Sequence, residues 1–318
     1  MFFGIYTITM QTVLITGGTG LIGRALSTAL LDRGYAVIIL TREKRPASKV
    51  PHLSYAVWDI EQDKIDEDAF GKADYIVHLA GAGVADKRWT KKRKQEIVDS
   101  RVKSGRILME SIALLPNKVK TLVSSSAIGW YGGDRFNNGN DQSTRPFVEE
   151  DPPANDFLGQ TCEEWEDSLI PTTATFDVRL VILRTGIVLS KQGGALKEFM
   201  RPLKFGVATI LGTGRQVVSW IHIDDLVRLY ITAIENEQMN GVYNAVAPHP
   251  VSNKELILTL AKSRKKKFIT MLVPSFILRI AMGGLSIEVL KSCTVSANKV
   301  ISTGFTFSYP TIKSAFEQ

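Results

Sequence analysis

The stretch "TVLITGGTGLIGRAL", from Thr12 to Leu26, runs from an apolar segment directly into three glycines spaced three residues apart. A strand, a glycine-rich turn and a helix in this order are typical of a site for the pyrophosphate of a dinucleotide. Gly17 permits a tight turn, Gly20 lets the backbone approach the phosphates, and Gly23 lets helix and strand pack closely. Unpaired N–H groups at the helix N-terminus add donors for the anion. A glycine-rich turn without a ligand is the alternative. The predicted site comprises Gly17, Thr19, Gly20, Leu21, Ile22 and Gly23.

Beyond this stretch, strand-like runs alternate with helical segments. Runs this apolar are typical of parallel strands buried on both faces, and the alternation indicates βαβ units. We predict an α/β fold, a Rossmann doubly wound parallel sheet with a small C-terminal substrate lobe. Residues 11–185 are expected to form the dinucleotide-binding domain, to which 215–245 return, and residues 186–318 mostly the lobe. The predicted helices span 21–32, about 90–114 and 157–169; the predicted strands include "TVLIT", "YAVIILT", "YAVWDI", "ADYIVHLAG", "VKTLVSSS" and "FDVRLVILRTG".

The end of the second predicted strand indicates which cofactor binds. Sites for NAD carry Asp or Glu about 20 residues beyond the glycines, where the carboxylate binds the ribose 2′-hydroxyl. Thr41 and Arg42 stand at that place in this chain. Arg42, together with Lys44 or Arg45, could pair with a 2′-phosphate. We therefore predict NADP(H) rather than NAD(H), although exposed basic residues after a strand are also common. Asp59, at the end of the third strand, could accept a hydrogen bond from the adenine amino group or serve as a turn residue.

Composition narrows the classes of partner and compartment. The 318 residues are 44% hydrophobic, which suffices for a full core. The net charge is +7 with a pI near 9.3, and the excess gathers in 91–94 and 264–267. No aromatic residues interleave with these clusters, which favours solvated helix faces and no nucleic-acid partner. Two cysteines, Cys162 and Cys293, have no disulfide or metal-ligand pattern, so we expect no metal and a reducing, cytoplasmic location.

Two apolar segments raise the question of membrane targeting. The first ten residues carry no basic region, and a signal peptide would have to include the first strand, so we expect none; Met10 is an alternative start. The second segment, "FITMLVPSFILRIAMGGL", is interrupted by Pro274 and Arg279 and falls short of about 18 uninterrupted apolar residues. We expect a buried or groove-facing helix there and no stable membrane insertion.

Several motifs together resemble one enzyme superfamily. "TGGTGLIG", "HLAG", "SSSAIGWYG", "LRTGIVL" and "SWIHIDDLV" occur in the order typical of extended short-chain dehydrogenases/reductases. "LAGAGVADKRWT", "DSRV", "DFLGQTCEEWE" and "LVPSFILRIAMGGL…GFTFSYP" resemble the atypical epimerase-family branch, similar to nucleoside-diphosphate-sugar epimerases. The resemblance covers residues 11–317, with 269–317 as a branch-specific tail. It implies NADP(H) binding, with Leu79, Ala80 and Gly81 of "HLAG" beside the cofactor. Arg88, on the loop that follows, could bind a cofactor phosphate or a substrate anion, or be a surface residue.

Two positions depart from the superfamily pattern. The resemblance implies a Tyr and, four residues later, a Lys at the start of the helix after the catalytic Ser. Here Leu158 and Cys162 stand at those places, and neither can transfer the proton or supply the cation. Ser126 matches the superfamily Ser, and Tyr131 lies five residues further, so these two are the predicted catalytic residues. The alternatives are a strand-end cap for Ser126 and a packed loop aromatic for Tyr131. Cys162 could be a reactive thiol, but no helix start or basic pair is visible nearby to activate it, so a small buried residue is the expectation.

A lone histidine before a predicted helix suggests a catalytic role, but the resemblance indicates a structural one for His222. In "WIHIDDL", His222 with Asp224 or Asp225 is expected to cap a helix and fix the lobe against the first domain.

Two classes of function follow from these observations. The first is an NADP(H)-dependent oxidoreductase or epimerase acting on a small polar, sugar-nucleotide-like molecule. The second is a non-catalytic NADP(H)-binding sensor or scaffold, which the missing Tyr and Lys favour. The expected partner is a small-molecule substrate; its identity, the reaction direction and the oligomeric state are left open.

Overall fold

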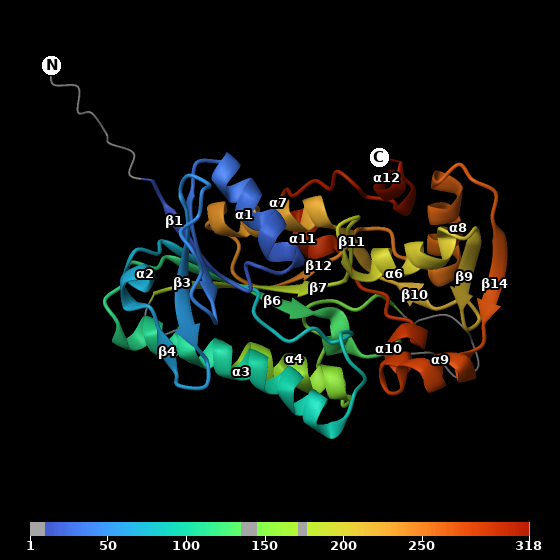
Figure 1. The fold of residues 1–318 in the computed structure, drawn as a ribbon, viewed down its shortest axis with the longest axis horizontal. Helices are drawn as coiled ribbons and strands as arrows, with labels where there is room; N and C mark the ends of the chain where they lie inside the picture. Colours follow the sequence, from blue (N-terminus) through green and yellow to red (C-terminus); the bar gives the residue numbers. More distant parts are fainter. Residues whose placement is uncertain (1–9, 135–144, 171–176, 318) are drawn as a thin grey trace, which may run out of the picture.

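The computed structural model describes residues 10–134, 145–170 and 177–317. Its centre is an eight-stranded sheet with the order β12-β7-β6-β5-β1-β2-β3-β4 (Figure 1). Every neighbouring pair is parallel except β3 and β4, so the predicted α/β Rossmann fold is confirmed. The strands are β1 (Thr12–Thr16), β2 (Ala36–Thr41), β3 (Leu53–Asp59), β4 (Lys64–Ile65), β5 (Tyr75–His78), β6 (Thr121–Ala127), β7 (Arg179–Thr185) and β12 (Gly241–Ala245).

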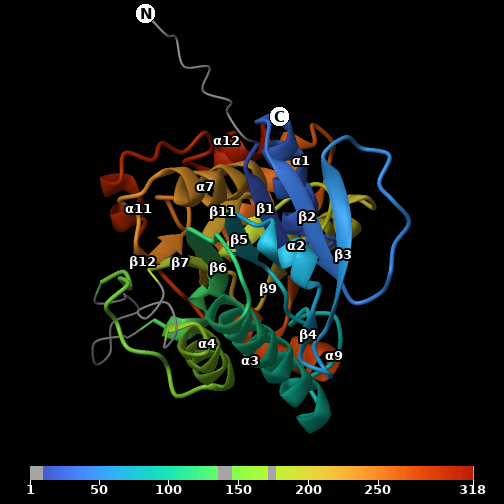
Figure 2. The same ribbon diagram turned by 90° about the vertical axis from the view of Figure 1, so that its left-hand side faces the viewer.

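Helices cover both faces of this sheet. α1 (Leu21–Asp32) and α7 (Ile223–Glu235) pack together on one face, while α3 (Lys91–Leu114), α4 (Phe157–Asp167) and the short α2 (Glu67–Gly71) lie on the other (Figure 2). Successive side chains of a strand point to opposite faces. Val13 and Ile15 of β1 therefore enter the core under α1 and α7, and Leu14 enters the core under α3. Burial on both faces explains why the strands are continuously apolar.

The lobe lies beside the carboxyl ends of the central strands (Figure 1). Outside the central sheet, the described strands pair as β8 (Ile187–Leu189) with β11 (Trp220–His222), β9 (Val207–Leu211) with β14 (Ile269–Val273), and β10 (Val217–Val218) with β13 (Val251–Ser252). A separate hydrophobic core in this part of the molecule contains Trp220 and Leu256. The remaining described helices are η1 (Ile128–Tyr131), α6 (Gly194–Leu203), α8 (Asn253–Ser263), α9 (Ser275–Met282), α10 (Leu285–Leu290), α11 (Asn298–Ser302), which packs on β12, and α12 (Ile312–Phe316).

The cap predicted at His222 is present. Nδ1 of His222 accepts a hydrogen bond from the backbone N–H of Asp224 at 3.2 Å, at the N-terminus of α7. The fully buried carboxylate of Asp225 accepts the backbone N–H groups of Ser308 and Tyr309, both at 2.8 Å. The predicted helix cap is therefore confirmed. That the motif fixes the lobe against the first domain stays a prediction, which the contacts of Asp225 with Ser308 and Tyr309 support.

The apolar stretch around Pro274 folds differently from the prediction. We expected one helix, but residues 269–273 form strand β14, and α9 begins directly after Pro274. Proline cannot donate in a ladder and favours a helix start, which explains the break. Of α9 only Leu278 is buried, and Ile280 is 71% exposed. The prediction of a single helix is thus wrong. Among the described residues, no helix has both the length and the apolar character needed to cross a bilayer.

Candidate cofactor and active site

The glycine loop between β1 and α1 has the geometry that a phosphate site requires. Gly17 has a φ of +67°, and a Cβ added there would lie 2.6 Å from the carbonyl oxygen of Leu79. A Cβ on Gly23 would lie 2.5 Å from the oxygen of Gly17, so this glycine permits the packing of α1 on the strand. A Cβ on Gly20 would meet only the Gly17 oxygen, at 3.2 Å, and otherwise faces open space. This is the face that a pyrophosphate would approach.

The N-terminus of α1 offers backbone N–H donors. Gly20 is its N-cap, no side chain in the described part of the structure caps the helix, and no acidic residue lies in the first turn. The guanidinium of Arg24 donates to the carbonyl of Thr19 at 2.6 Å, which adds a cation beside the loop. Leu21 and Ile22 lie in the first turn of α1, and their contact with a cofactor stays a prediction. The unpaired N–H groups and the helix dipole together favour an anion here.

The loop after β5 is tied to the glycine loop at the point where the strand order reverses. β2 lies on one side of β1 and β5 on the other, and ligands of doubly wound sheets bind at this crevice. The Thr16 hydroxyl accepts the backbone N–H groups of Leu79 and Ala80, each at 3.1 Å. Gly81 follows, so the predicted "HLAG" residues and the glycine loop are brought together.

His78, the last residue of β5, lies between the hydroxyl groups of Thr16 on β1 and Ser104 on α3. Its Nδ1 lies 2.7 Å from the hydroxyl of Thr16 and its Nε2 lies 3.3 Å from that of Ser104. Burial, with a smaller contribution from Arg101, lowers its pKa to about 3, so the ring is neutral near pH 7. Both lone pairs of the Thr16 oxygen accept backbone N–H groups, so its proton goes to Nδ1 of His78.

The residues predicted around the adenosine half lie at the ends of β2 and β3. The buried hydroxyl of Thr41 donates to the carbonyl of Glu43 at 2.7 Å, and Arg42 is exposed. Asp59 Oδ1 accepts hydrogen bonds from the backbone N–H groups of Glu61 and Gln62. These contacts match the alternative role of Asp59 as a turn residue. The adenine contact of Asp59 stays a prediction. Both strands end at the same sheet edge as β1, so Arg42 and the glycine loop share that edge.

Arg88 lies against the C-terminal tail. A Cβ on Gly283, in the turn between α9 and α10, would lie 2.8 Å from Arg88 Nε. The neighbouring Trp89 donates through its indole nitrogen to Val84 O at 2.8 Å, and its ring packs edge-on against Phe157 at 5.0 Å. The loop thus links α4 to the tail, and phosphate binding by Arg88 stays a prediction.

Ser126 belongs to a buried polar network. Its hydroxyl donates to Glu166 Oε1 at 2.6 Å. Arg184 binds the same carboxylate twice, through Nε at 2.9 Å and Nη2 at 2.8 Å. This bidentate ion pair is buried at both ends, so the surrounding hydrogen bonds are needed to offset its desolvation.

Tyr131 joins the same network from the other side. Its hydroxyl donates to Asn244 Oδ1 at 2.6 Å and accepts from Arg184 Nη1 at 3.1 Å. The ring stacks on Phe147 at 5.1 Å, and the residue is 3% exposed. Burial raises the pKa of Tyr131 well above its ordinary value, although Arg184 acts in the opposite direction. These contacts match the packed-aromatic alternative, and a catalytic role for Tyr131 stays a prediction.

The two positions on α4 that depart from the superfamily pattern hold side chains that are unreactive at neutral pH. Cys162 lies on α4, its thiol donates to Ala127 O at 3.6 Å, and burial raises its pKa to about 12. Leu158 packs toward Gly129: a Cβ added to Gly129 would lie 3.1 Å from the Cβ of Leu158. Neither residue offers a proton at neutral pH.

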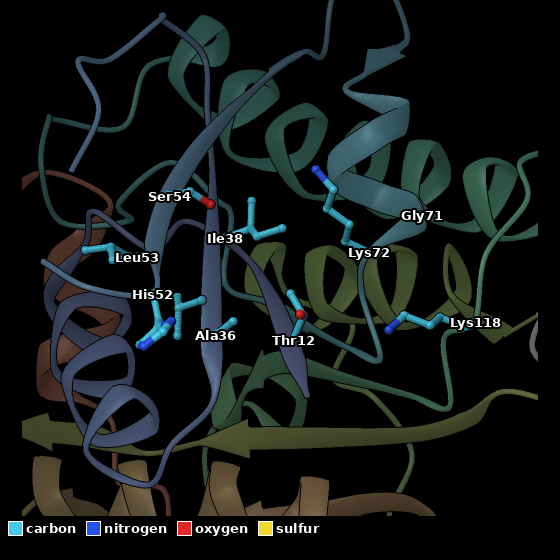
Figure 3. Close-up of a pocket in the computed structure, with 10 residues that line it drawn as sticks. Thr12, Ala36, Ile38, His52, Leu53, Ser54, Gly71, Lys72 and Lys118 are labelled. Carbon is cyan, nitrogen blue, oxygen red and sulfur yellow. The ribbon is translucent and has the colours of Figure 1, made fainter. Parts of the chain in front are cut away.

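One cavity lies on the opposite edge of the sheet (Figure 3). It has a volume of about 430 Å³ and is lined by residues at the amino ends of β1, β2 and β3, among them Thr12, Ala36 and Leu53, and by Lys118, which precedes β6. Ligands of open α/β sheets bind outside the carboxyl ends of the strands, so this cavity is not the candidate site. No grouping of three or more His, Cys, Asp or Glu side chains suited to a metal occurs in the part of the chain that the structure describes.

Sequence reasoning missed the charged residues that organise the active-site edge. Arg184 is the one charged residue in the apolar run "LVILRTG", residues 180–186, and this isolation was the available signal. Arg101 lies in "DSRV", quoted above only as part of the resemblance. Asn244 carries no local signal, because its partners Tyr131 and Glu149 are about a hundred residues away in the chain.

Comparison with known proteins places the chain among relatives of the same length. The model of the NAD dependent epimerase/dehydratase family matches residues 13–245, and a domain of unknown function, DUF1731, matches residues 273–318. An epimerase family protein of Staphylococcus saprophyticus is 37% identical over 309 residues, covering 97% of this chain and 99% of that protein. The epimerase family protein YfhF of Bacillus subtilis is 32% identical and covers 97% of each.

Solved structures agree with this assignment. Human epimerase family protein SDR39U1, crystallised with NADPH, has a TM-score of 0.83 at 26% identity, covering 96% of this chain and 98% of that one. A nucleoside-diphosphate sugar epimerase from Corynebacterium glutamicum has a TM-score of 0.74 at 31% identity; the match covers 96% of this chain but 57% of that longer protein. With a family model spanning most of the chain and relatives above 30% identity along its length, this protein belongs to the NAD dependent epimerase/dehydratase family, as an atypical extended short-chain dehydrogenase/reductase.

Proposed function

We propose that this protein binds NADP(H) and acts as an oxidoreductase or epimerase on a small polar, sugar-nucleotide-like molecule. The observation that carries the cofactor assignment is the end of β2, where Thr41 and the exposed Arg42 stand in place of an acidic residue. The free N-terminus of α1 and the open face of Gly20 supply the phosphate site. The related human structure contains NADPH, which supports the same choice.

Calorimetric titration of NADPH and NADH tests this assignment. A charged pair with the 2′-phosphate contributes about 1.5–3 kcal/mol, so NADPH should bind roughly tenfold to a hundredfold more tightly. Arg42→Asp should reverse that preference by repelling the phosphate. The exposed Lys49 is a control, because Lys49→Asp makes the same charge change away from the strand end. Equal affinities of the native protein for both cofactors would refute the assignment.

The chemistry at Ser126 bears on the substrate. Its hydroxyl proton is directed to Glu166, so as placed the oxygen is free only to accept hydrogen bonds. A hydroxyl-bearing substrate suits this acceptor better than an isolated carbonyl does. This supports a sugar-like molecule as the substrate class.

A second candidate function is a non-catalytic NADP(H)-binding protein. Ser126 and Tyr131 are 2% and 3% exposed, and each hydroxyl already donates to a protein group. Leu158 and Cys162 replace the proton-transfer pair. Both features favour a site that holds the cofactor without turning it over.

Single-turnover oxidation of bound NADPH separates the two candidates. A panel of carbonyl compounds and sugar nucleotides is mixed with the NADPH complex, and loss of nicotinamide absorbance is followed. Turnover that is slowed at least tenfold by Ser126→Ala, with Cys162→Ala as the unaffected control, supports the enzyme. No oxidation by any member of the panel favours the binding protein.

A further inference from the structure

Arg101, on α3, extends toward the loop that follows β5. Its Nη1 donates to the carbonyl oxygens of Ala82 at 3.1 Å and Ile97 at 2.9 Å. Its guanidinium carbon lies 5.0 Å from the centre of the Trp165 ring on α4. A Cβ on Gly81 would lie 3.1 Å from the same carbon. The side chain is therefore fixed directly under the loop that contributes "HLAG" to the cofactor crevice.

The charge of Arg101 lacks a partner, unlike that of the other inward-facing arginines. Arg184 pairs with Glu166, and Arg93 pairs with Glu96 at 2.8 Å. Arg179 has no carboxylate but bonds three backbone carbonyls through both terminal nitrogens. Over the described ranges, Arg101 has no carboxylate within 4.0 Å, and its hydrogen bonds all leave from Nη1.

Two nitrogens of Arg101 are consequently available. Nε and Nη2 have no acceptor among the described residues, and they are not among the fully enclosed polar atoms. Burial lowers the pKa of Arg101, so removing the guanidinium from water is unfavourable in this state. An oxygen ligand on the two free nitrogens would offset this cost.

The path of a bound dinucleotide leads to this place. Arg42 lies at the end of β2, on one side of the glycine loop, and β5 and β6 lie on the other side of β1. A cofactor with its 2′-phosphate at Arg42 and its pyrophosphate at Gly20 must extend its second half over β5 toward β6. Arg101 lies there, because it contacts Gly81 after β5 and neighbours Cys162, whose thiol bonds Ala127 at the end of β6.

We propose that Arg101 binds ribose and phosphate oxygens in the nicotinamide half of the cofactor. The inference rests on the proposed NADP(H) binding and adds a residue from α3 to that site. Nε and Nη2 form a planar pair of donors, which suits two neighbouring oxygens. The positive charge beside the nicotinamide half would thus come from Arg101 on α3. On α4, the position of the superfamily lysine is occupied by Cys162.

The test compares three ligands by calorimetry: NADPH, 2′-phospho-ADP-ribose, which lacks only the nicotinamide, and 2′,5′-ADP, which carries only the adenosine half. Arg101→Gln should weaken NADPH and 2′-phospho-ADP-ribose by about tenfold to a hundredfold. Binding of 2′,5′-ADP should stay within twofold, which also reports that the variant is folded. Arg106→Gln, an exposed residue on the same helix, is the matched control and should change none of the three.

Every other outcome overturns the inference. Equal weakening of 2′,5′-ADP would assign Arg101 a structural role, as would unchanged binding of all three. Weakening of NADPH alone would place the contact at the nicotinamide ring. Should Arg101→Gln fail to fold, Arg101→Lys replaces it; the loss expected is smaller but again confined to the two longer ligands, because Lys keeps the charge without the donor pair. Native protein that binds no NADPH but retains its fold refutes the proposed function instead.

Discussion

At the scale of single residues, burial sets the protonation state of the groups nearest the cofactor crevice. His78 is fully buried between Thr16 and Ser104, and no carboxylate pairs with it among the described residues. A neutral imidazole can make both contacts, one as acceptor and one as donor. Burial disfavours the charged imidazolium, and the nearby charge of Arg101 disfavours it further, so the pKa of His78 falls to about 3.

We predict that His78 makes the protein less stable in mild acid. Its folded pKa of about 3 lies below the unfolded value of 6.5, so the unfolded chain binds the extra proton first. The contribution of neutral His78 to the free energy of unfolding is fully present above pH 6.5. It declines as the pH falls, by about 1.4 kcal/mol per pH unit toward pH 3. Urea unfolding between pH 7 and 4.5 measures this slope.

The variant His78→Asn should flatten the slope, while lowering stability at pH 7 through the lost packing. His52 is the matched control, because it is exposed and has a φ of 61°, which Asn tolerates. His52→Asn should leave the slope unchanged. An equal slope in the native protein and in His78→Asn would contradict the assignment of the acid sensitivity to His78.

The two cysteines are predicted to be inert in the native state. Burial raises the pKa of both Cys162 and Cys293 to about 12, and only the thiolate is an effective nucleophile. A disulfide reagent at pH 8 should therefore titrate fewer than 0.2 thiols in roughly the first ten minutes, because under about one in a thousand is ionised. Both should react at once in denaturant. Rapid native reaction abolished by Cys162→Ala would show that this thiol is exposed and activated.

At the scale of elements, two glycines of the turn between β1 and α1 have different roles: Gly23 permits helix packing, and Gly20 leaves room for the proposed ligand. A Cβ on Gly23 would collide with backbone atoms of Gly17 and Gly18 at 2.5 Å, whereas a Cβ on Gly20 meets a single atom at 3.2 Å. Gly23→Val should therefore destabilise the fold by about 3 kcal/mol or more, at the upper end of overpacking effects. Gly20→Val should remain folded but lose NADPH binding, since its side chain occupies the phosphate face.

Thermal unfolding and cofactor titration of the two variants check this contrast. The Gly23→Val protein should unfold at least several degrees earlier than the Gly20→Val protein. If Gly20→Val binds NADPH like the native protein, the dinucleotide does not approach this face of the loop.

Elements with strong periodic patterns could be predicted from the sequence, and those that depend on distant partners could not. α1 spans the predicted residues 21–32, and Thr90 caps α3 at the predicted start by accepting the N–H of Arg93. The stretch that includes β14 and α9 is equally apolar, but its hydrophobicity gave no information on the pairing of β14 with β9. Strand pairing is a non-local contact, so a local pattern does not specify it.

The candidate site divides in the same way. The glycine loop and Arg42 are local signals, because strand, turn and helix follow one another in the chain. The network of Ser126, Glu166 and Arg184 joins three elements, with partners 18 and 40 residues apart. The sequence showed a missing Tyr and Lys, but which groups fill that space depends on how α3 and α4 pack against the sheet.

At the scale of the whole molecule, the C-terminal segment connects the lobe to the central domain. Asp225 on α7 holds the backbone of Ser308 and Tyr309, and the Tyr309 ring lies 4.0 Å from that of His222. Beyond these contacts, α12 packs on α8 of the lobe. One buried carboxylate on the sheet-covering helix therefore helps to fix the lobe relative to the cofactor edge.

Removal of this carboxylate should loosen the connection without destroying the cofactor site. Asp225 is fully buried and also pairs with Arg228 at 2.7 Å, so Asp225→Ala leaves two backbone N–H groups without their acceptor and removes the carboxylate partner of Arg228, which keeps its hydrogen bonds to Ser308 and Thr306. Breaking a buried charged contact in this way costs about 3–5 kcal/mol. Hydrogen exchange should rise in residues 305–317 and in α8 before it rises in β1 or α1, while the affinity for NADPH changes less than threefold. The exposed neighbour Asp224 serves as control, since Asp224→Ala should leave exchange in the C-terminal segment near its native level. Uniform exchange across both parts of the molecule would show instead that lobe and sheet unfold as one unit and that Asp225 is not the joint between them.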